Sequence, residues 1–378
     1  MCSFKAVIFI TVFQLFYFSA DGAPKFIASK FDHMDFKLMQ RLNSTNLGAS
    51  LTSFKSFKSQ YQRVYKDFNE YHDRFLVFRK NLDIIDELQR KEKGTAKFGI
   101  TQFADLTPEE FDRQYNGMKM SGAAHDEENE RVDELDIENP RYYDWRKHGA
   151  VTPVKQQGAC FSCWAFSTTG NIEGLLARKT GELKTLSEQE LVDCDSRNHG
   201  CMGGFMTEAV RELAHNLGGL VAADDYPYLE DDAICTLNKT QIIAPVKDVV
   251  VFSKKEENIA KWVYKIGPLS AGINAKLLQY YLGGIMQPTE ENCPSGRLNH
   301  GVLIVGYGIQ KIPNGQIPYW TIKNSWGKQW GEQGYFKIYR GNGSCGINQI
   351  VSSAVLHEEE EASESEEYYD STEDNNTD

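Results

Sequence analysis

The 378-residue chain has only one long apolar run, and it lies at the beginning. Residues 6–20 are almost wholly apolar, follow Lys5 and lead into small residues around Ala20 and Ala23. The run is short and poorly flanked for a membrane span, and no other segment is apolar enough to cross a bilayer. A basic residue, an apolar stretch and small residues in that order predict a secretory signal peptide over residues 1–22. We therefore expect no membrane span and a chain in the secretory pathway, with a lysosomal or extracellular destination.

Basic residues are missing from the other end of the chain. Between His357 and Asp378 there are eleven Asp or Glu residues and no Lys or Arg. These acids account for nearly all of the net charge of −12, so the rest of the chain is close to neutral. No basic patch indicates a nucleic-acid partner. Since the acidic segment cannot bury enough apolar surface to order itself, we predict a disordered tail over residues 357–378.

The chain also lacks a second cysteine pair with metal-ligand spacing. Cys160 and Cys163 are separated by two residues, but nothing elsewhere completes a zinc site, so we expect no metal and no cofactor. Once Cys2 leaves with the signal peptide, seven cysteines remain. An odd number in an oxidising compartment leaves one free thiol, although the count does not say which cysteines pair.

Three short runs carry the chemistry. A thiol, an imidazole and an amide occur in that order, with His300 lying 137 residues and Asn324 lying 161 residues after Cys163. Taken singly, such residues are more often structural than catalytic; together they are the parts of a cysteine protease. The runs are Gln-Gln-Gly-Ala-Cys-Phe-Ser-Cys-Trp-Ala-Phe (156–166), Asn-His-Gly (299–301) and Lys-Asn-Ser-Trp-Gly (323–327). The chain resembles the papain family, whose local signature these runs match except that Phe161 replaces a glycine.

The resemblance implies a role for each catalytic residue. Cys163 would be the nucleophile and His300 its imidazolium partner, while Asn324 would orient the imidazole. Gln157 and the backbone N–H of Cys163 would form the oxyanion hole. A helix predicted to begin near Cys163 would lower the pKa of the thiol through its dipole.

The resemblance also implies the substrate cleft. An apolar S2 pocket would accept a hydrophobic residue at P2, the second residue before the scissile bond, and no insertion closes either end of the cleft, so we expect an endopeptidase. Phe161 would line and narrow S1. The substrate-binding residues expected on this basis are Gly203, Gly204, Phe205, Met206, Gly272, Asn299, Gly301, Trp326, Ile350 and Phe161. The alternatives are a catalytically weak or silent homologue that acts as a binding or decoy protein because of Phe161, and an inhibitor whose active part is the propeptide.

Residues 23–138 resemble an inhibitory propeptide. The stretch from Phe54 to Lys93 has helical spacing without Gly or Pro, and its pattern of residues points to the cathepsin F branch: Glu70, Arg74, Phe78, Asn81, Ile85 and Gln89. A second propeptide motif follows at Gly99–Leu106, and an acidic linker leads to a peptidase domain at 139–356. We expect acid to release the propeptide because protonated carboxylates such as Asp105 would lose their pairings.

The fold expected is α+β: a helical lobe and a β-rich lobe with the active-site cleft between them, preceded by the mainly helical propeptide. The sequence predicts a helix over Cys163–Thr180 and another that begins after Ser187 in a capping box. Strands are predicted at Val302–Val305, Tyr319–Ile322 and Tyr335–Tyr339.

Covalent modifications and partners complete the expectations. The resemblance implies the disulfides Cys160–Cys201, Cys194–Cys235 and Cys293–Cys345, with Cys163 free. The short glycosylation motif occurs at Asn43, Asn238, Asn342 and Asn375. Expected partners are protein and peptide substrates, the enzyme's own propeptide as inhibitor and cystatin-type inhibitors, with the enzyme as a monomer.

Overall fold

The computed structural model describes residues 16–18, 24–26, 34–35, 37–38, 41, 47–118, 131–132, 135–313 and 315–358. Most of the predicted signal peptide and the acidic tail after Glu358 lie outside these residues, so both stay predictions. Near the start, β1 (Phe16–Phe18) pairs antiparallel with β2 (Pro24–Phe26). Within the described residues, no helix is both long and apolar enough to span a membrane.

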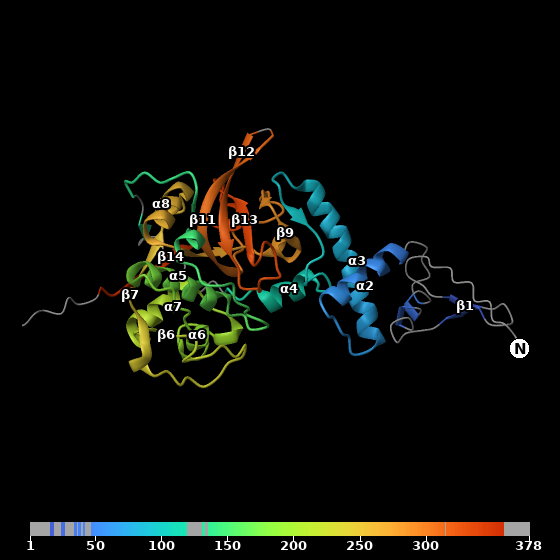
Figure 1. Ribbon diagram of the computed structural model, residues 1–378, viewed down its shortest axis with the longest axis horizontal. Coiled ribbons are helices and arrows are strands. Elements are labelled where there is room, and N and C mark those ends of the chain that lie inside the picture. Colours follow the sequence, from blue (N-terminus) through green and yellow to red (C-terminus); the bar gives the residue numbers. More distant parts are fainter. Residues whose placement is uncertain are drawn as a thin grey trace, which may run out of the picture.

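Among the described residues, the predicted propeptide contains the helices α2 (Leu47–Gln60), α3 (Phe68–Lys91) and α4 (Pro108–Tyr115), drawn in blue to teal in Figure 1. The stretch from Phe54 to Lys93, which has helical spacing, forms two helices, because the chain turns between α2 and α3. Gln62 adopts a left-handed φ of 52°, and Asp67 caps α3 by accepting from the N–H groups of Asn69 and Glu70. The turn folds α2 back on α3 around a buried aromatic cluster of Phe54, Phe57, Tyr71, Phe75 and Phe78.

The helical lobe is built on α5 (Cys163–Thr180), which has the predicted bounds, with α6 (Glu188–Cys194) and α7 (Met206–Glu212) beside it. Ser187 is the N-cap of α6, since its Oγ accepts from the N–H of Glu190 at 3.0 Å. The reciprocal half of the predicted capping box does not form. The Glu190 carboxylate instead accepts from the N–H of Val221, and the N–H of Ser187 donates to the Val221 carbonyl.

The β-rich lobe contains the three predicted strands, which are confirmed within β11, β12 and β13. The main sheet has the order β10-β13-β12-β11-β8-β14-β7-β4; β5 also pairs with β11, and β6 pairs with β7. Its strands are β4 (Arg131–Val132), β5 (Tyr143–Asp144), β6 (Gly219–Val221), β7 (Ile242–Phe252), β8 (Leu269–Ile273), β10 (Ile285–Met286), β11 (His300–Ile312), β12 (Gly315–Lys323), β13 (Tyr335–Tyr339) and β14 (Val351–Leu356). Helix α8 (Glu256–Ile266) packs against β11, and β3 (Lys97–Phe98) of the predicted propeptide pairs with β9 (Tyr281–Gly283).

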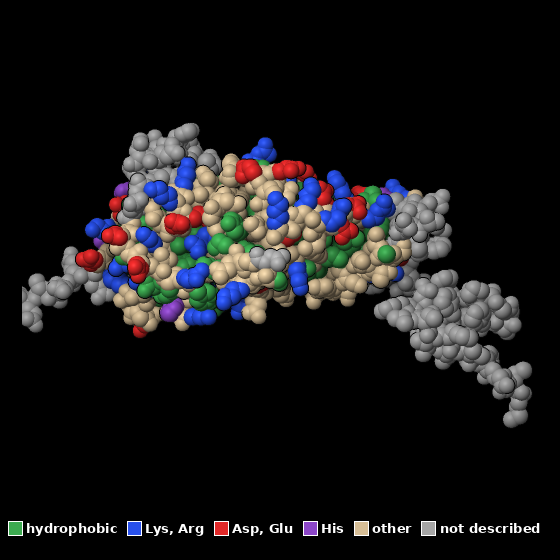
Figure 2. All heavy atoms as spheres, turned by 90° about the horizontal axis from the view of Figure 1, so that it is seen from above, with side chains coloured by type: hydrophobic (Ala, Val, Ile, Leu, Met, Phe, Trp, Pro, Cys, Tyr) green, Lys and Arg blue, Asp and Glu red, His purple; other side chains and the backbone are tan. Residues whose placement is uncertain are grey.

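The two-lobe α+β arrangement is therefore confirmed, with α5 packed against β11, β8 and β14 where the lobes meet. Helix α4 lies between the other two propeptide helices, α2 and α3, and the two lobes (Figure 1). On the face seen in Figure 2, acidic and basic side chains are interspersed around apolar patches, as expected for a nearly neutral body. The start of α5 and the start of β11 both fall at the junction of the lobes, which positions the site.

Candidate active site

The first residue of α5 carries the candidate nucleophile. Cys163 is fully buried, and Ser162 precedes it as N-cap without a side-chain capping bond. The Cys163 sulfur accepts from the backbone N–H of Gly301 at 3.3 Å. Gly301 follows His300 at the start of β11. This contact therefore brings the thiol of one lobe against the strand of the other lobe that carries His300.

His300, Asn324 and Trp326 form a layered group. His300 Nε2 lies 2.8 Å from Asn324 Oδ1, and that oxygen also accepts from the N–H of Ser325. The Trp326 ring lies 4.7 Å from the His300 ring, centroid to centroid, and is buried over it. Among the described residues, His300 Nδ1 has no hydrogen-bond partner. The amide therefore fixes one ring nitrogen and leaves the other free for proton transfer.

Gln157 is held firmly beside the thiol. Its Oε1 accepts from Ser325 Oγ at 2.6 Å, and its backbone N–H donates to the Ser325 carbonyl. This leaves Nε2 as the donor, which contacts the carbonyl oxygens of Cys160 at 3.1 Å and Tyr115 at 3.3 Å. An amide N–H fixed in this way suits an oxyanion hole, because no reorganisation is needed when negative charge develops.

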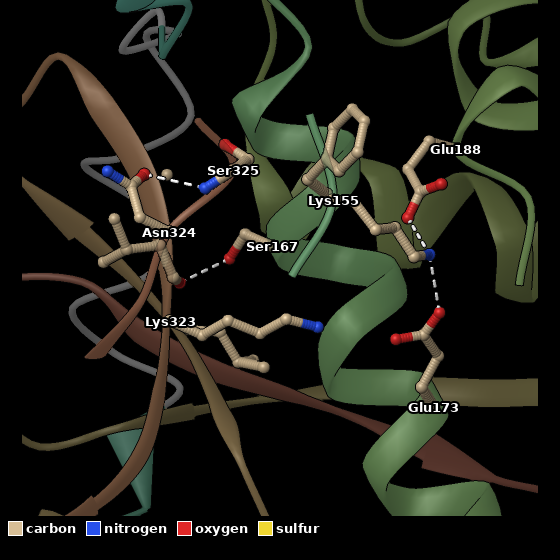
Figure 3. Close-up of a pocket in the computed structure, with 11 residues that line it drawn as sticks. Lys155, Ser167, Glu173, Glu188, Lys323, Asn324 and Ser325 are labelled. Atoms are coloured by element: carbon tan, nitrogen blue, oxygen red, sulfur yellow. Dashed lines mark hydrogen bonds and ion pairs between the residues drawn. The ribbon is translucent and has the colours of Figure 1, made fainter. Parts of the chain in front are cut away.

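Behind Asn324 lies a buried cluster of charges that joins the two lobes (Figure 3). Lys155 donates to Glu173 of α5 at 2.7 Å and also to Glu188 of α6. Lys323, the neighbour of Asn324 in β12, donates to Thr152, which in turn donates to Glu173. Burial alone would raise the pKa of Glu173, but Lys155 and Lys323 lower it, so this carboxylate stays charged. A cavity of about 20 Å³ remains between these groups and the backbone of β11, enough for one ordered water.

The segment after α4 crosses directly over the nucleophile. The N–H of Gly117 donates to the Cys163 sulfur at 3.3 Å, and the Gly117 carbonyl accepts from the N–H of Gly204 at 2.9 Å. Met118 pairs with Gly204 in a parallel bridge and donates its N–H to the Asn299 carbonyl. The predicted propeptide thus fills the cleft with its own backbone.

The Met118 side chain occupies the predicted S2 pocket. It is only 5% exposed and belongs to the same apolar cluster as Phe205, Met206 and Ile350. A Cβ on Gly272 would lie 3.0 Å from the Met118 sulfur, so glycine leaves the space that Met118 fills. The sequence reading missed Leu298, which packs against this cluster, and it missed Met118 itself. Neither carries a local signal, because both reach the pocket through long-range contacts.

Aromatic residues before and within α4 cover Trp326. Phe103, Phe111 and Tyr115 each meet the Trp326 ring edge-on, with centroids 5.3, 5.3 and 6.2 Å away. Asn299 Nδ2 donates to Asp112 of α4 at 2.6 Å. Residues of the predicted propeptide between Phe103 and Met118 therefore contact the predicted site residues.

Cys163 and His300, the candidate catalytic pair, are both fully buried with this segment in place. Removal from water raises the pKa of the Cys163 thiol to about 11, although the N–H groups of Gly301 and Gly117 oppose this. Burial likewise lowers the pKa of His300 to about 4. Both groups are neutral between these values, so the expected lowering of the thiol pKa by the helix dipole is outweighed in the covered state.

Phe161 is half-buried beside this segment. Its N–H donates to the Cys201 carbonyl, next to the disulfide. A Cβ on Gly117 would lie 1.9 Å from the Phe161 carbonyl oxygen and 2.5 Å from the Phe161 Cβ. The backbone and Cβ of Phe161 therefore stand directly against Gly117, the residue above Cys163, while the S1 role of the Phe161 ring stays a prediction.

The structure contains the three disulfides that the resemblance implies, Cys160–Cys201, Cys194–Cys235 and Cys293–Cys345. Among the described residues Cys163 is the free cysteine, so Cys160 is not available for a zinc site. Asn238 and Asn342 are exposed. Asn43 and Asn375 lie outside the described residues.

Comparison with known proteins agrees with this geometry. Residues 139–355 match the papain family cysteine protease domain, and residues 54–111 match the cathepsin propeptide inhibitor domain (I29). The chain belongs to the papain family of cysteine proteases and carries its inhibitory propeptide.

Named relatives narrow the likeness. The chain is 44% identical over 311 residues to cathepsin F of Drosophila melanogaster and 43% identical over 312 residues to cathepsin F of Mus musculus, covering 80% of this chain each time. It spans 50% and 64% of the length of those two proteins. Among solved structures, a digestive procathepsin L2 from Tenebrio molitor larval midgut has a TM-score of 0.72 at 34% identity, over 81% of this chain and all of that one.

Proposed function

We propose that this chain is the zymogen of a cysteine endopeptidase that hydrolyses peptide bonds through Cys163, His300, Asn324 and Gln157. The observation that carries the proposal is the backbone of Gly117 lying on the Cys163 sulfur while Met118 fills the adjoining apolar pocket. A site that holds extended peptide in this way suits a peptide substrate. The predicted signal peptide favours a lysosomal or extracellular location.

The reaction would run in two halves. With the propeptide gone, a proton passes from the thiol to His300, and the thiolate attacks the substrate carbonyl carbon. A C–S bond forms, and Gln157 Nε2 and the N–H of Cys163 stabilise the oxyanion. His300 then gives its proton to the leaving amine as the C–N bond breaks. In the second half, water loses a proton to His300 and attacks the thioester, which releases the acid and restores the thiol.

The direction of the propeptide explains why it is not cut. In a substrate, P2 precedes P1 in the sequence, so the chain runs from the apolar pocket toward Cys163. Here the residue in the pocket, Met118, follows the residue above the sulfur, Gly117, so the propeptide runs the opposite way. It presents an N–H to the sulfur, and its carbonyl oxygen points to Gly204. Without a carbonyl carbon in line, attack does not begin.

The apolar pocket supports a hydrophobic P2 preference. Phe205, Met206 and Ile350 belong to one buried apolar cluster with Met118. A charged P2 side chain would have to be desolvated there without a partner.

Acid release cannot depend on Asp105 as expected, because the pKa of this carboxyl is shifted in the direction opposite to the one that the expectation requires. This carboxyl is 3% exposed, and burial raises its pKa although Arg63 and the Tyr65 hydroxyl oppose the rise. A carboxyl whose folded pKa is raised is favoured by protonation, so acid stabilises the folded propeptide at this position. Glu110 has the opposite sign and is the better candidate. Burial would raise its pKa, but hydrogen bonds from Arg74 and the N–H of Thr107 lower it.

The test is turnover of fluorogenic peptides by matured enzyme and by Cys163→Ala. We expect hydrolysis by the wild type, with Leu or Val at P2 favoured over Arg, and none by the variant, which should remain a folded zymogen. Turnover by Cys163→Ala would contradict the assignment of the nucleophile. A matured wild type that is alkylated at Cys163 but hydrolyses no peptide would instead favour the decoy alternative.

A further inference from the structure

The side chain of Asn198 is bound to the segment Gly203–Phe205 as a neighbouring β-strand would be; this segment, which follows Cys201 and Met202, is called the cleft segment below. Its Oδ1 accepts from the N–H of Phe205 at 2.7 Å, and its Nδ2 donates to the Phe205 carbonyl at 3.4 Å. This two-way exchange is the pattern of a hydrogen-bonded pair in an antiparallel sheet. Asn198 is 8% exposed, and it reaches the cleft segment from the loop after α6.

Asp195 holds that amide in place. Its Oδ2 accepts the remaining Nδ2 proton of Asn198 at 2.6 Å, and its Oδ1 accepts from the backbone N–H groups of Arg197 and Asn198. All the donors and the acceptor of the Asn198 amide are therefore used, and the amide cannot turn without breaking several bonds at once. Asp195 is itself 7% exposed.

The cleft segment held in this way is the one that takes the peptide. Gly204 donates its N–H to the Gly117 carbonyl, and Phe205 lies in the apolar cluster around Met118. Gly204 has no freedom to move inward, because a Cβ there would lie 2.6 Å from Asn198 Oδ1 and 2.8 Å from the Trp164 ring. The Asn198 amide thus fixes the position of the Gly204 and Phe205 backbone in the cleft.

We propose that Asn198, oriented by Asp195, is a positioning residue for substrate: its side-chain amide fixes the segment Gly203–Phe205, which binds the substrate backbone and its P2 side chain. The inference rests on the proposed function, since it takes Gly204 and Phe205 as substrate-binding. In the described structure neither Asn198 nor Asp195 makes a hydrogen bond to Cys163 or His300. Substituting them should therefore weaken substrate binding and leave the thiolate chemistry unchanged.

The experiment compares matured wild type, Asn198→Ala and Asp195→Asn on a fluorogenic peptide with Leu at P2. Removing the amide should raise KM about tenfold, the cost of roughly one hydrogen bond. The rise in Asp195→Asn should be smaller, since that variant keeps the volume and one acceptor. In both, kcat and the rate of alkylation by iodoacetamide, which needs no P2 contact, should change little.

Asp193→Asn is the matched control. Asp193 also accepts three hydrogen bonds in the same lobe, from Gln189, Ala233 and Tyr226, but none of these reaches the cleft segment. Its KM should match the wild type.

The outcomes separate the two proposals. A wild type without preference for an apolar P2 would refute the pocket assignment of the proposed function. A wild type with that preference, together with unchanged KM in both variants, would refute only the positioning role. Parallel loss of kcat, alkylation rate and melting temperature at constant KM would also overturn it, because a purely structural defect gives that result. Asp195→Asn supplies the same readout if the alanine variant does not mature.

Discussion

Replacing Gly117 by alanine should open the zymogen. The space above Cys163 is closed on that side by rigid backbone, since the new Cβ would lie 1.9 Å from the Phe161 carbonyl oxygen and 2.5 Å from the Phe161 carbonyl carbon. Phe161 cannot retreat easily, because it adjoins the Cys160–Cys201 disulfide and donates its N–H to Cys201. The propeptide segment must therefore lift instead.

The cost follows from the contacts that lifting breaks. The Gly117 N–H loses the Cys163 sulfur, and its carbonyl loses the Gly204 N–H, at about 1 kcal/mol for each bond. Any overpacking that remains adds about 1 kcal/mol or more. A total of about 3 kcal/mol corresponds to roughly a hundredfold larger population of the open state.

The assay is alkylation of Cys163 in the intact zymogen at neutral pH, followed by mass spectrometry so that only unprocessed chain is counted. In the wild type the sulfur is fully buried and the thiol pKa is about 11, so alkylation occurs only through opening. The rate should rise about a hundredfold in Gly117→Ala, in proportion to the open population. Gly48→Ala in α2 is the control, because a Cβ there meets nothing within 4 Å. Equal rates for Gly117→Ala and wild type would refute the steric argument.

Three further changes probe the rest of the molecule. Glu110→Gln removes the 2.7 Å ion pair with Arg74. In the wild type this pair stabilises the propeptide above about pH 4.5 and is lost as the pH falls through the lowered pKa of Glu110. Processing of the variant, followed on gels, should therefore occur at higher pH than in the wild type, and an unchanged pH profile would exclude Glu110 as a trigger. Phe161→Gly should raise kcat/KM, most for large P1 residues, with little change in iodoacetamide alkylation; no gain with any P1 residue would mean that Phe161 points away from S1. A chain that ends at Leu356 loses two hydrogen bonds at the edge of the fold, from Lys179 to the His357 carbonyl and from the His357 N–H to the Pro245 carbonyl. Its melting temperature should therefore fall only slightly and its peptide kinetics should equal those of the full chain, whereas a large loss of stability would mean that the tail docks on the enzyme.

Local sequence signals predicted helix boundaries where a capping residue beside the helix determines them. The helix Cys163–Thr180 has the predicted bounds because it ends at Gly181, which adopts a left-handed φ of 77° and closes the helix as a C-cap. The break before Phe68 was visible in principle, since Asp67 followed by Glu70 is an N-terminal signal. Helical spacing across the gap concealed it, because the charged and aromatic pattern continues through residues 61–67.

Tertiary contacts decided what the sequence did not show. Glu190 has the right spacing for a capping box, yet the N–H of Val221 takes its carboxylate, since a strand 31 residues away packs there. Met118 and Leu298 both lie beside Gly272, in the predicted S2 pocket, through long-range contacts that have no local signature. The direction of the Asp105 pKa shift depends on how completely this carboxyl is buried, and the periodicity of a sequence does not measure burial.

Two opposing effects act on the Cys163 thiol, and the propeptide decides which is larger. The start of α5 favours the thiolate in any state of the protein, because free N–H groups point toward the sulfur. Burial under Gly117 and the aromatic cover on Trp326 favours the neutral thiol and the neutral imidazole, and in the zymogen it wins. Removing the cover returns water to both side chains while the helix terminus and the Asn324 hydrogen bond remain. Under the proposed function the propeptide would therefore inhibit in two ways: its reversed backbone offers the sulfur no carbonyl carbon, and burial of Cys163 and His300 favours the neutral form of each.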